Sequence, residues 1–172
     1  MTERKVLITD KVHPLLIEGL KDMGFIVDYD TSVENEQLEK IIDQYEGIII
    51  NSKIIMNHVR IDMGKNLKFI GRLGSGLEII DVSYARSKGI GVYNSPEGNR
   101  NAVAEHEMGM LLALFNNIVR ADNELRKFDW NREKNRGREL KGKAIGIIGL
   151  GNTGEAFAEK LSSWGMRVLS YD

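Results

Sequence analysis

Three glycines near the end of the chain have the spacing of a phosphate-binding turn. Gly149, Gly151 and Gly154 follow a short apolar run and precede a stretch with helical periodicity. In such a turn the first glycine permits a tight bend, the second lets a pyrophosphate approach the backbone, and the third lets helix and strand pack closely. We therefore expect the backbone amides of Asn152 and Thr153 to face a phosphate at the positive end of the helix dipole.

The next apolar run ends in a carboxylate that could select the nucleotide. Asp172 follows the third glycine at about the separation, roughly 20 residues, at which this motif places an acidic residue on the adenosine ribose. A 2′-phosphate at that position would meet like charge, so the pattern favours NAD(H) over NADP(H). Two alternatives stay open here: a glycine-rich turn without a ligand, and a turn for another adenosine cofactor such as S-adenosylmethionine.

Short apolar runs alternate with amphipathic stretches along the chain, which predicts parallel βαβ units and an α/β fold. Continuous apolar runs suit strands that are covered on both faces. Strands are expected at residues 6–9, 25–27, 48–50, 67–70, 90–93, 145–148 and 168–171. Helices are expected at residues 16–23, 38–45, 82–86, 102 to about 128, and 154–164.

A break in this pattern predicts a domain boundary near residues 98–101, where Gly98 and two asparagines precede the long helix. We expect residues 1–100 to form one domain, and residues 101–172 to form a connecting helix and the start of a second. A doubly wound nucleotide-binding domain needs about six strands, whereas one βαβ unit follows the boundary. We therefore expect the second domain to be truncated and the chain to be a fragment.

Charge and composition disfavour several classes of function. Lys and Arg number 24 and Asp and Glu number 25, and a net charge of −1 leaves no electrostatic footprint for nucleic acid or an anionic membrane. The absence of cysteine excludes disulfides and thiolate chemistry, and three histidines make a metal cage improbable, so no metal is expected. The sequence has neither a signal-peptide core nor a bilayer-spanning apolar run, which favours a cytoplasmic protein.

Five segments together resemble the D-isomer-specific 2-hydroxyacid dehydrogenases, with the phosphoglycerate dehydrogenase branch nearest. They are RLGSGLEIID at 72–81, NSPEGN at 94–99, VAEH at 103–106, GLGNTG at 149–154 and GMRVLSYD at 165–172. The resemblance implies a flavodoxin-like substrate domain, a long helix into a Rossmann domain that binds NAD, a small 2-hydroxy or 2-oxo acid as substrate, and a homodimer in the full-length protein.

The same resemblance implies roles for particular positions. The loop that contains Ser75 and Gly76 would offer backbone amides to the substrate carboxylate, although a glycine-rich turn without a ligand is the simpler interpretation of the residues alone. Residues Asn51, Ser52 and Lys53 would lie beside the substrate, and Val103 would approach the nicotinamide ring. The family often has Arg-Ser where this chain has Asn51-Ser52, which counts against a phosphorylated substrate. Lys53 could compensate, so 3-phosphoglycerate stays open as the substrate.

No residue is expected to be catalytic. Oxidation of a hydroxy acid needs a cation for the carboxylate and a base for the hydroxyl proton, and in the resembled family an arginine and a glutamate–histidine pair supply them later in the chain. His13 is expected to be solvated or to cap a helix, His58 to lie in a polar loop, and His106 to pack at the domain junction. We therefore expect this chain to be inactive alone.

Two other functions remain as alternatives. The first is a non-catalytic module that senses NAD or binds partners, as in the corepressors that resemble this family. The second is an adenosine-cofactor enzyme related to S-adenosylhomocysteine hydrolase, which the segment 94–106 fits poorly.

Overall fold

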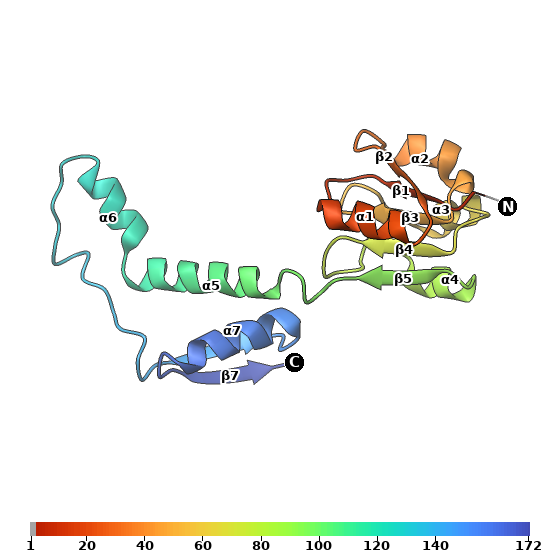
Figure 1. The fold of residues 1–172 in the computed structure, drawn as a ribbon. Helices are drawn as coiled ribbons and strands as arrows, with labels where there is room; N and C mark the ends of the chain where they lie inside the picture. Colours follow the sequence, from red (N-terminus) through yellow and green to blue (C-terminus); the bar gives the residue numbers. More distant parts are fainter. Residues whose placement is uncertain (1–2) are drawn as a thin grey trace. The chain divides into compact units, whose positions relative to one another are not determined.

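The computed structural model describes residues 3–172 and divides them into two compact units, residues 3–96 and residues 97–172 (Figure 1). None of the helices among the described residues combines the length and the apolar composition needed to cross a bilayer.

The first unit is built on a five-stranded parallel sheet in the order β2-β1-β3-β4-β5. Its strands are β1 (Lys5–Ile8), β2 (Ile26–Tyr29), β3 (Gly47–Ile50), β4 (Phe69–Arg72) and β5 (Gly91–Asn94). All four strand pairings are parallel, so the carboxyl ends of the strands share one edge of the sheet. The order is that of a flavodoxin-like fold, in which ligands bind at the carboxyl edge beside the β1/β3 switch point.

Helices cover both faces of this sheet. They are α1 (Pro14–Asp22), α2 (Asn35–Ile41), the short 3₁₀ helix η1 (Ile42–Gln44), α3 (His58–Met63) and α4 (Val82–Ser87). Ile48 and Ile50 of β3 lie in one buried cluster with residues of α2, α3 and α4, whereas Ile49 lies in a second cluster with Leu20 of α1. Neighbouring side chains of one strand thus enter different cores, which explains the continuous apolar runs.

The second unit holds three helices and a two-stranded parallel sheet. Its elements are α5 (Arg100–Phe115), α6 (Ile118–Leu125), β6 (Ala144–Ile148), α7 (Asn152–Ser162) and β7 (Arg167–Tyr171). Its buried cluster joins α5, β6 and α7 through Ala104, Met108, Ile147, Phe157 and Leu161. The α/β fold predicted from the sequence, with a flavodoxin-like sheet followed by one βαβ unit, is confirmed.

The prediction of one long helix at residues 102–128 is wrong. α5 ends before Asn116, and α6 begins after Asn117, whose φ of 53° is left-handed. Asparagine tolerates that conformation better than most residues, and Asn116 donates its side-chain amide to the carbonyl of Leu112. Two consecutive asparagines therefore end one helix and begin the next.

Three smaller expectations also differ from the structure. His58 begins helix α3 rather than lying in a polar loop, because Asn57 caps the helix by accepting a hydrogen bond from the Arg60 amide at 3.0 Å. Met23 and Trp164, the last residues of the helices expected at 16–23 and 154–164, lie beyond the ends of α1 and α7 and are 66% and 43% exposed. Helical periodicity continued past the residues at which the backbone leaves the helix.

Candidate functional site

Two loops follow neighbouring strands at the carboxyl edge of the first unit. Residues 51–53 follow β3 and residues 74–76 follow β4, and these strands pair directly. The Leu73 amide donates to the carbonyl of Ile50 at 2.9 Å, which extends the pairing to the point where both loops begin. The edge that presents them is the one at which open parallel sheets bind ligands.

The loop at residues 74–76 requires a glycine at its first position. Gly74 has a φ of +151°, which other L-residues rarely adopt. A β-carbon there would also lie 2.7 Å from Nη1 of Arg72, whose side chain is only 12% exposed. Both the backbone conformation and the buried guanidinium beside its α-carbon therefore favour glycine at position 74.

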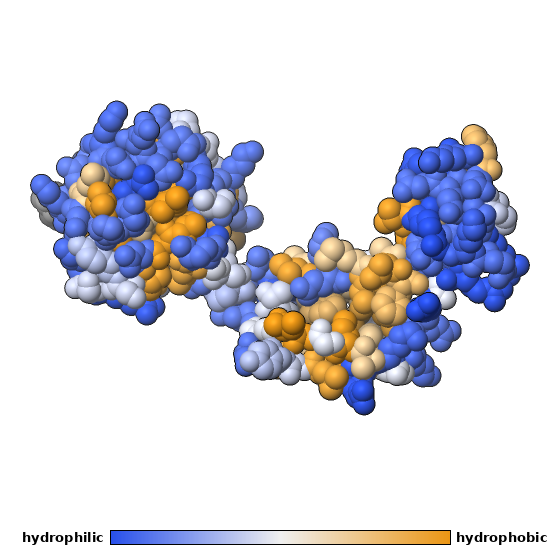
Figure 2. All heavy atoms as spheres, turned by 180° about the vertical axis from the view of Figure 1, so that it is seen from behind, coloured by the Kyte–Doolittle hydropathy of each residue, from blue (hydrophilic) through white to orange (hydrophobic). Residues whose placement is uncertain are grey.

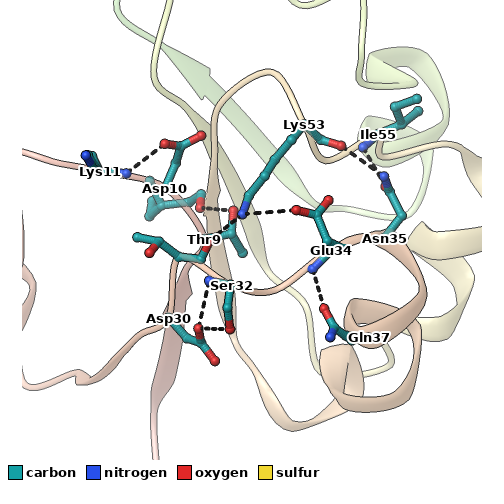
Figure 3. A network of polar contacts seen from close by, with 12 residues as sticks. Thr9, Asp10, Lys11, Asp30, Ser32, Glu34, Asn35, Gln37, Lys53 and Ile55 are labelled. Atoms are coloured by element: carbon teal, nitrogen blue, oxygen red, sulfur yellow. Dashed lines mark hydrogen bonds and ion pairs between the residues drawn. The ribbon is translucent and has the colours of Figure 1, made fainter.

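Lys53, one of the expected substrate contacts, directs its ammonium toward the loop between β2 and α2 (Figure 3). Its Nζ donates to the carbonyl of Thr31 at 2.6 Å and lies 3.7 Å from Oε1 of Glu34. Asn35 of α2 holds the backbone of the segment that contains Lys53. Its side-chain nitrogen donates to the carbonyl of Lys53 at 2.9 Å, and its side-chain oxygen accepts from the Ile55 amide at 3.0 Å. The charge of Lys53 is thus already matched by a carboxylate within the unit.

Asp30, at the carboxyl end of β2, belongs to the same polar network (Figure 3). The hydroxyl and the amide of Ser32 both donate to its Oδ1, and these bonds hold the pKa of the Asp30 carboxyl below its usual value, with a smaller electrostatic contribution from Lys53. The carboxyl edge near β2 therefore carries negative charge, which Lys53 offsets.

The glycine turn of the second unit has the geometry that its spacing predicts. Gly149 directly follows β6 with a φ of +91°, and Gly151 is the N-cap of α7 with no side-chain hydrogen bond to the helix. A β-carbon on Gly154 would lie 2.1 Å from the carbonyl oxygen of Gly149, so helix and turn approach too closely for any other residue. Asn152 and Thr153 form the first turn of α7, where backbone amides lack partners inside the helix.

Asp172 lies beside this turn rather than at a distance from it. Its Oδ1 accepts a hydrogen bond from the amide of Leu150 at 3.1 Å, and the Gly149 amide donates to the Tyr171 carbonyl at 2.8 Å. The carboxylate and the glycine turn therefore lie at one end of β6 and β7. Val103, the residue expected near a nicotinamide, is half-buried in the first turn of α5.

The three histidines have separate surroundings. His13 caps α1, because its Nδ1 accepts a hydrogen bond from the Leu15 amide at 3.3 Å, which confirms the expected capping role. The ring of His58 packs edge-on against Tyr84 at a centroid distance of 5.9 Å. His106 is exposed on α5, and the preceding Glu105 pairs with Lys160 at 3.4 Å.

The family follows from a comparison with known proteins. Residues 6–163 match the family described as D-isomer specific 2-hydroxyacid dehydrogenase, catalytic domain. The chain belongs to this family. The resemblance that the five motifs carried is thereby confirmed.

Individual relatives agree with the family match. D-3-phosphoglycerate dehydrogenase from Archaeoglobus fulgidus is 36% identical over 168 residues, which cover 98% of this chain and 32% of that protein. The chain thus spans about a third of the length of this curated relative.

Two solved structures share the fold. D-lactate dehydrogenase from Aquifex aeolicus, complexed with NAD and lactic acid, has a TM-score of 0.85 at 26% identity over 98% of this chain and 51% of that one. An acyclic imino acid reductase in complex with NADPH and D-Arg has a TM-score of 0.86 at 26% identity over 98% and 56%. Both complexes contain a nicotinamide cofactor.

Three residues of the site were not singled out as functional from the sequence. Arg72 and Asn94 both donate to the loop at 74–76, and Asn35 holds the loop at 51–53. An arginine that ends an apolar strand just before a glycine-rich loop is a signal that could have identified Arg72. Asn35 and Asn94 gave no such signal, because each lies 18 or 19 residues from the backbone group it binds.

Proposed function

We propose that this chain forms the substrate domain (residues 1–100) and the first cofactor-binding unit (residues 101–172) of an NAD-dependent oxidoreductase acting on the CH–OH group of a D-2-hydroxy acid. The observation that carries the proposal is the turn at Gly149, Gly151 and Gly154, with the Asp172 carboxylate at the same end of the two strands. Membership of the family supports the reaction class.

The residues of the turn fit a dinucleotide. Gly151 has open space at its α-carbon, so a pyrophosphate can approach the backbone there, and the first amides of α7 can donate to it. Asp172 would accept hydrogen bonds from the adenosine ribose hydroxyls. When bound, NAD would supply the hydride acceptor, and the protein's part is to hold and orient it.

The substrate would bind at the carboxyl edge of the first unit. The loop at 74–76 would present backbone amides to the carboxylate, and Asn51 and Ser52 lie on the adjacent loop. Neutral Asn51, together with the pairing of Lys53 with Glu34, favours an unphosphorylated acid over 3-phosphoglycerate. The phosphate group of such a substrate would have to compete with the Glu34 carboxylate for the Lys53 ammonium.

A titration with reduced cofactors tests the nucleotide half of this proposal. We expect the chain to bind NADH weakly and in preference to NADPH, measured by nicotinamide fluorescence. Asp172→Asn removes the like charge that opposes a 2′-phosphate and should reduce that preference by about tenfold. Asp10→Asn is the matched control, because Asp10 also accepts a hydrogen bond from a backbone amide, at 2.8 Å, but lies in the first unit. Equal binding of both cofactors by the unaltered chain would contradict the assignment.

The reaction itself is tested by turnover. No residue of the chain takes a catalytic role in our assignment, so we expect no NAD reduction with a panel of D-2-hydroxy acids. Measurable turnover that survives rigorous purification would show that a base and a carboxylate-binding cation are present among these residues.

We further propose that the assembled enzyme is a homodimer that pairs through α5 and α6. Exposed Met110, Leu114 and Val119 line a groove of about 770 Å³ that also carries charges of both signs, including Arg120 and Glu124. An apolar patch with both charges at its rim can complement itself across a two-fold axis. Sedimentation equilibrium of wild type and Leu114→Lys tests this, since the substitution should shift the protein to the monomer.

A further inference from the structure

All three carbonyl groups of the loop at residues 74–76 are held by donors of the same unit. The Ser95 amide donates to the carbonyl of Gly74 at 3.3 Å. The side-chain amide of Asn94 donates to the carbonyl of Ser75 at 2.6 Å, and Nη1 of Arg72 donates to the carbonyl of Gly76 at 2.7 Å. Two of these three donors are side chains, so the orientation of the loop depends on residues outside it.

Arg72 is buried in a way that stability alone does not explain. Its Nη2 is 3.5 Å from an oxygen of Glu78, a side chain that is 68% exposed, and its Nε is buried with no partner among the described residues. A buried donor without a partner costs stability. The guanidinium stays buried despite this cost, and its Nη1 donates to the carbonyl of Gly76. Its contribution is therefore to orient the loop.

Fixing these carbonyls also fixes the amides of the loop. In a planar trans peptide the C=O and N–H groups point in opposite directions. The Ser75 carbonyl shares a peptide with the Gly76 amide, and the Gly76 carbonyl shares one with the Leu77 amide. Neither amide donates to an acceptor within residues 3–172. Successive amides turned the same way form a concave site for an anion.

We propose that Arg72 and Asn94 are the positioning residues of this anion site, which the proposed function assigns to the substrate carboxylate. The inference rests on the proposed function. Asn94 holds the first peptide and Arg72 the second, so that the amides of Gly76 and Leu77 face the ligand. The positive charge of Arg72 behind the loop also favours an anion in front of it.

A titration with oxamate, an unreactive analogue of a 2-oxo acid, tests the proposal on the whole chain. Amide NMR shifts of Gly76 and Leu77 would report binding, and carbonyl ¹³C shifts of Ser75 and Gly76 would report the loop without ligand. We expect Asn94→Leu and Arg72→Met each to weaken oxamate binding about fivefold to tenfold and to move the carbonyl shift of the peptide that each one holds. Arg72→Lys should recover part of the affinity.

Two matched controls separate positioning from a loss of stability. Asn66 donates its side-chain amide to the Asp43 carbonyl at 2.6 Å, the same bond length as at Asn94. Asn66 precedes β4, whereas the loop at 74–76 follows that strand. Arg60 is 15% exposed and donates Nη1 to the Ile55 carbonyl at 2.8 Å. Asn66→Leu and Arg60→Met should lower the thermal midpoint as much as the test variants do, yet leave oxamate affinity and both loop carbonyl shifts unchanged.

The outcomes distinguish this inference from the function on which it rests. If wild type binds oxamate at Gly76 and Leu77 but both test variants bind it equally well, the positioning role is wrong and the site stands. If wild type shows no shift at these amides, or responds equally to neutral oxamide, the carboxylate site itself is wrong and the positioning role is overturned with it.

Discussion

Two strands with similar apolar sequences, one in each unit, differ in how deeply they are buried. In β3 (Gly47–Ile50) every residue is buried, whereas in β6 (Ala144–Ile148) only Ile147 is buried and Ile148 is 90% exposed. β3 lies between β1 and β4 and has helices on both faces, whereas β6 pairs with β7 alone. An apolar run therefore predicts a strand, but its burial depends on the neighbours that cover it.

The surface shows the same difference. Apolar residues show on both units in Figure 2, and the second unit's exposed large apolar side chains include Leu169 and Tyr171 of β7, which are 53% and 77% exposed. Exposed apolar patches of this kind often mark contact surfaces. The first unit is therefore held together mainly by its own core, and the second carries apolar surface available for contacts.

The largest expected effect comes from truncating the last isoleucine of each strand. Ile50→Ala removes a fully buried side chain from β3 and should lower the free energy of unfolding by about 2–5 kcal/mol. Ile148→Ala, the matched change at the end of β6, should alter it by less than about 0.5 kcal/mol. Urea unfolding followed by circular dichroism measures both. Similar losses would show that β6 is as well covered as β3.

The second prediction concerns the turn that joins β6 to α7. Gly154→Ala would place a β-carbon against the Gly149 carbonyl, and we expect a loss of about 1–3 kcal/mol from the resulting displacement. Gly109→Ala in α5 is the control, since a β-carbon there meets nothing within 4 Å and should stabilise the helix by up to about 1 kcal/mol. Opposite signs in thermal unfolding are expected, and stabilisation by both would refute close packing at the turn.

Much of the fold and part of the site could be predicted because their signals are local. The strands lie within about two residues of their expected places, and the glycine turn is recognisable because three residues of fixed spacing carry its chemistry. The break between α5 and α6 was missed because apolar periodicity continued across Asn116 and Asn117. The pairing of Lys53 with Glu34 could not be predicted, since it depends on how the loops after β2 and β3 meet.

The third prediction uses a buried phenol in the first unit. Tyr45 donates its hydroxyl to Asp28 at 2.9 Å, and burial, followed by this hydrogen bond and nearby negative charge, raises its pKa to about 12. A raised folded-state pKa means that the stabilisation is fully present below the unfolded pKa of about 10 and is lost as pH rises toward 12.

Wild type should therefore lose about 1 kcal/mol between pH 9 and pH 11 relative to Tyr45→Phe, less than the full pKa shift implies because pH 11 still lies below the raised pKa of about 12. Urea midpoints of both proteins at the two pH values measure this. Parallel pH profiles would show that Tyr45 ionises as freely in the folded protein as in the unfolded chain.

The smallest expected effect on stability comes from the N-terminus of a helix, where the two units differ most clearly. α3 in the first unit is capped by the Asn57 side chain, whereas α7 in the second begins at Gly151, which has no side chain to cap it. Gly151 has an ordinary φ of −74° and open space at its α-carbon, so serine fits there without strain. Gly151→Ser should therefore stabilise the protein by a few tenths of a kcal/mol through capping.

The same substitution should weaken NADH binding, because the serine hydroxyl would occupy the amides and the space that a pyrophosphate needs. Thermal unfolding and a fluorescence titration of the one variant measure the two effects together. A gain in stability with unchanged affinity would show that the glycine serves only the turn. A gain in stability with a loss of affinity would show that α7 is left uncapped to keep its first amides for a ligand, a cost in stability that α3 does not bear.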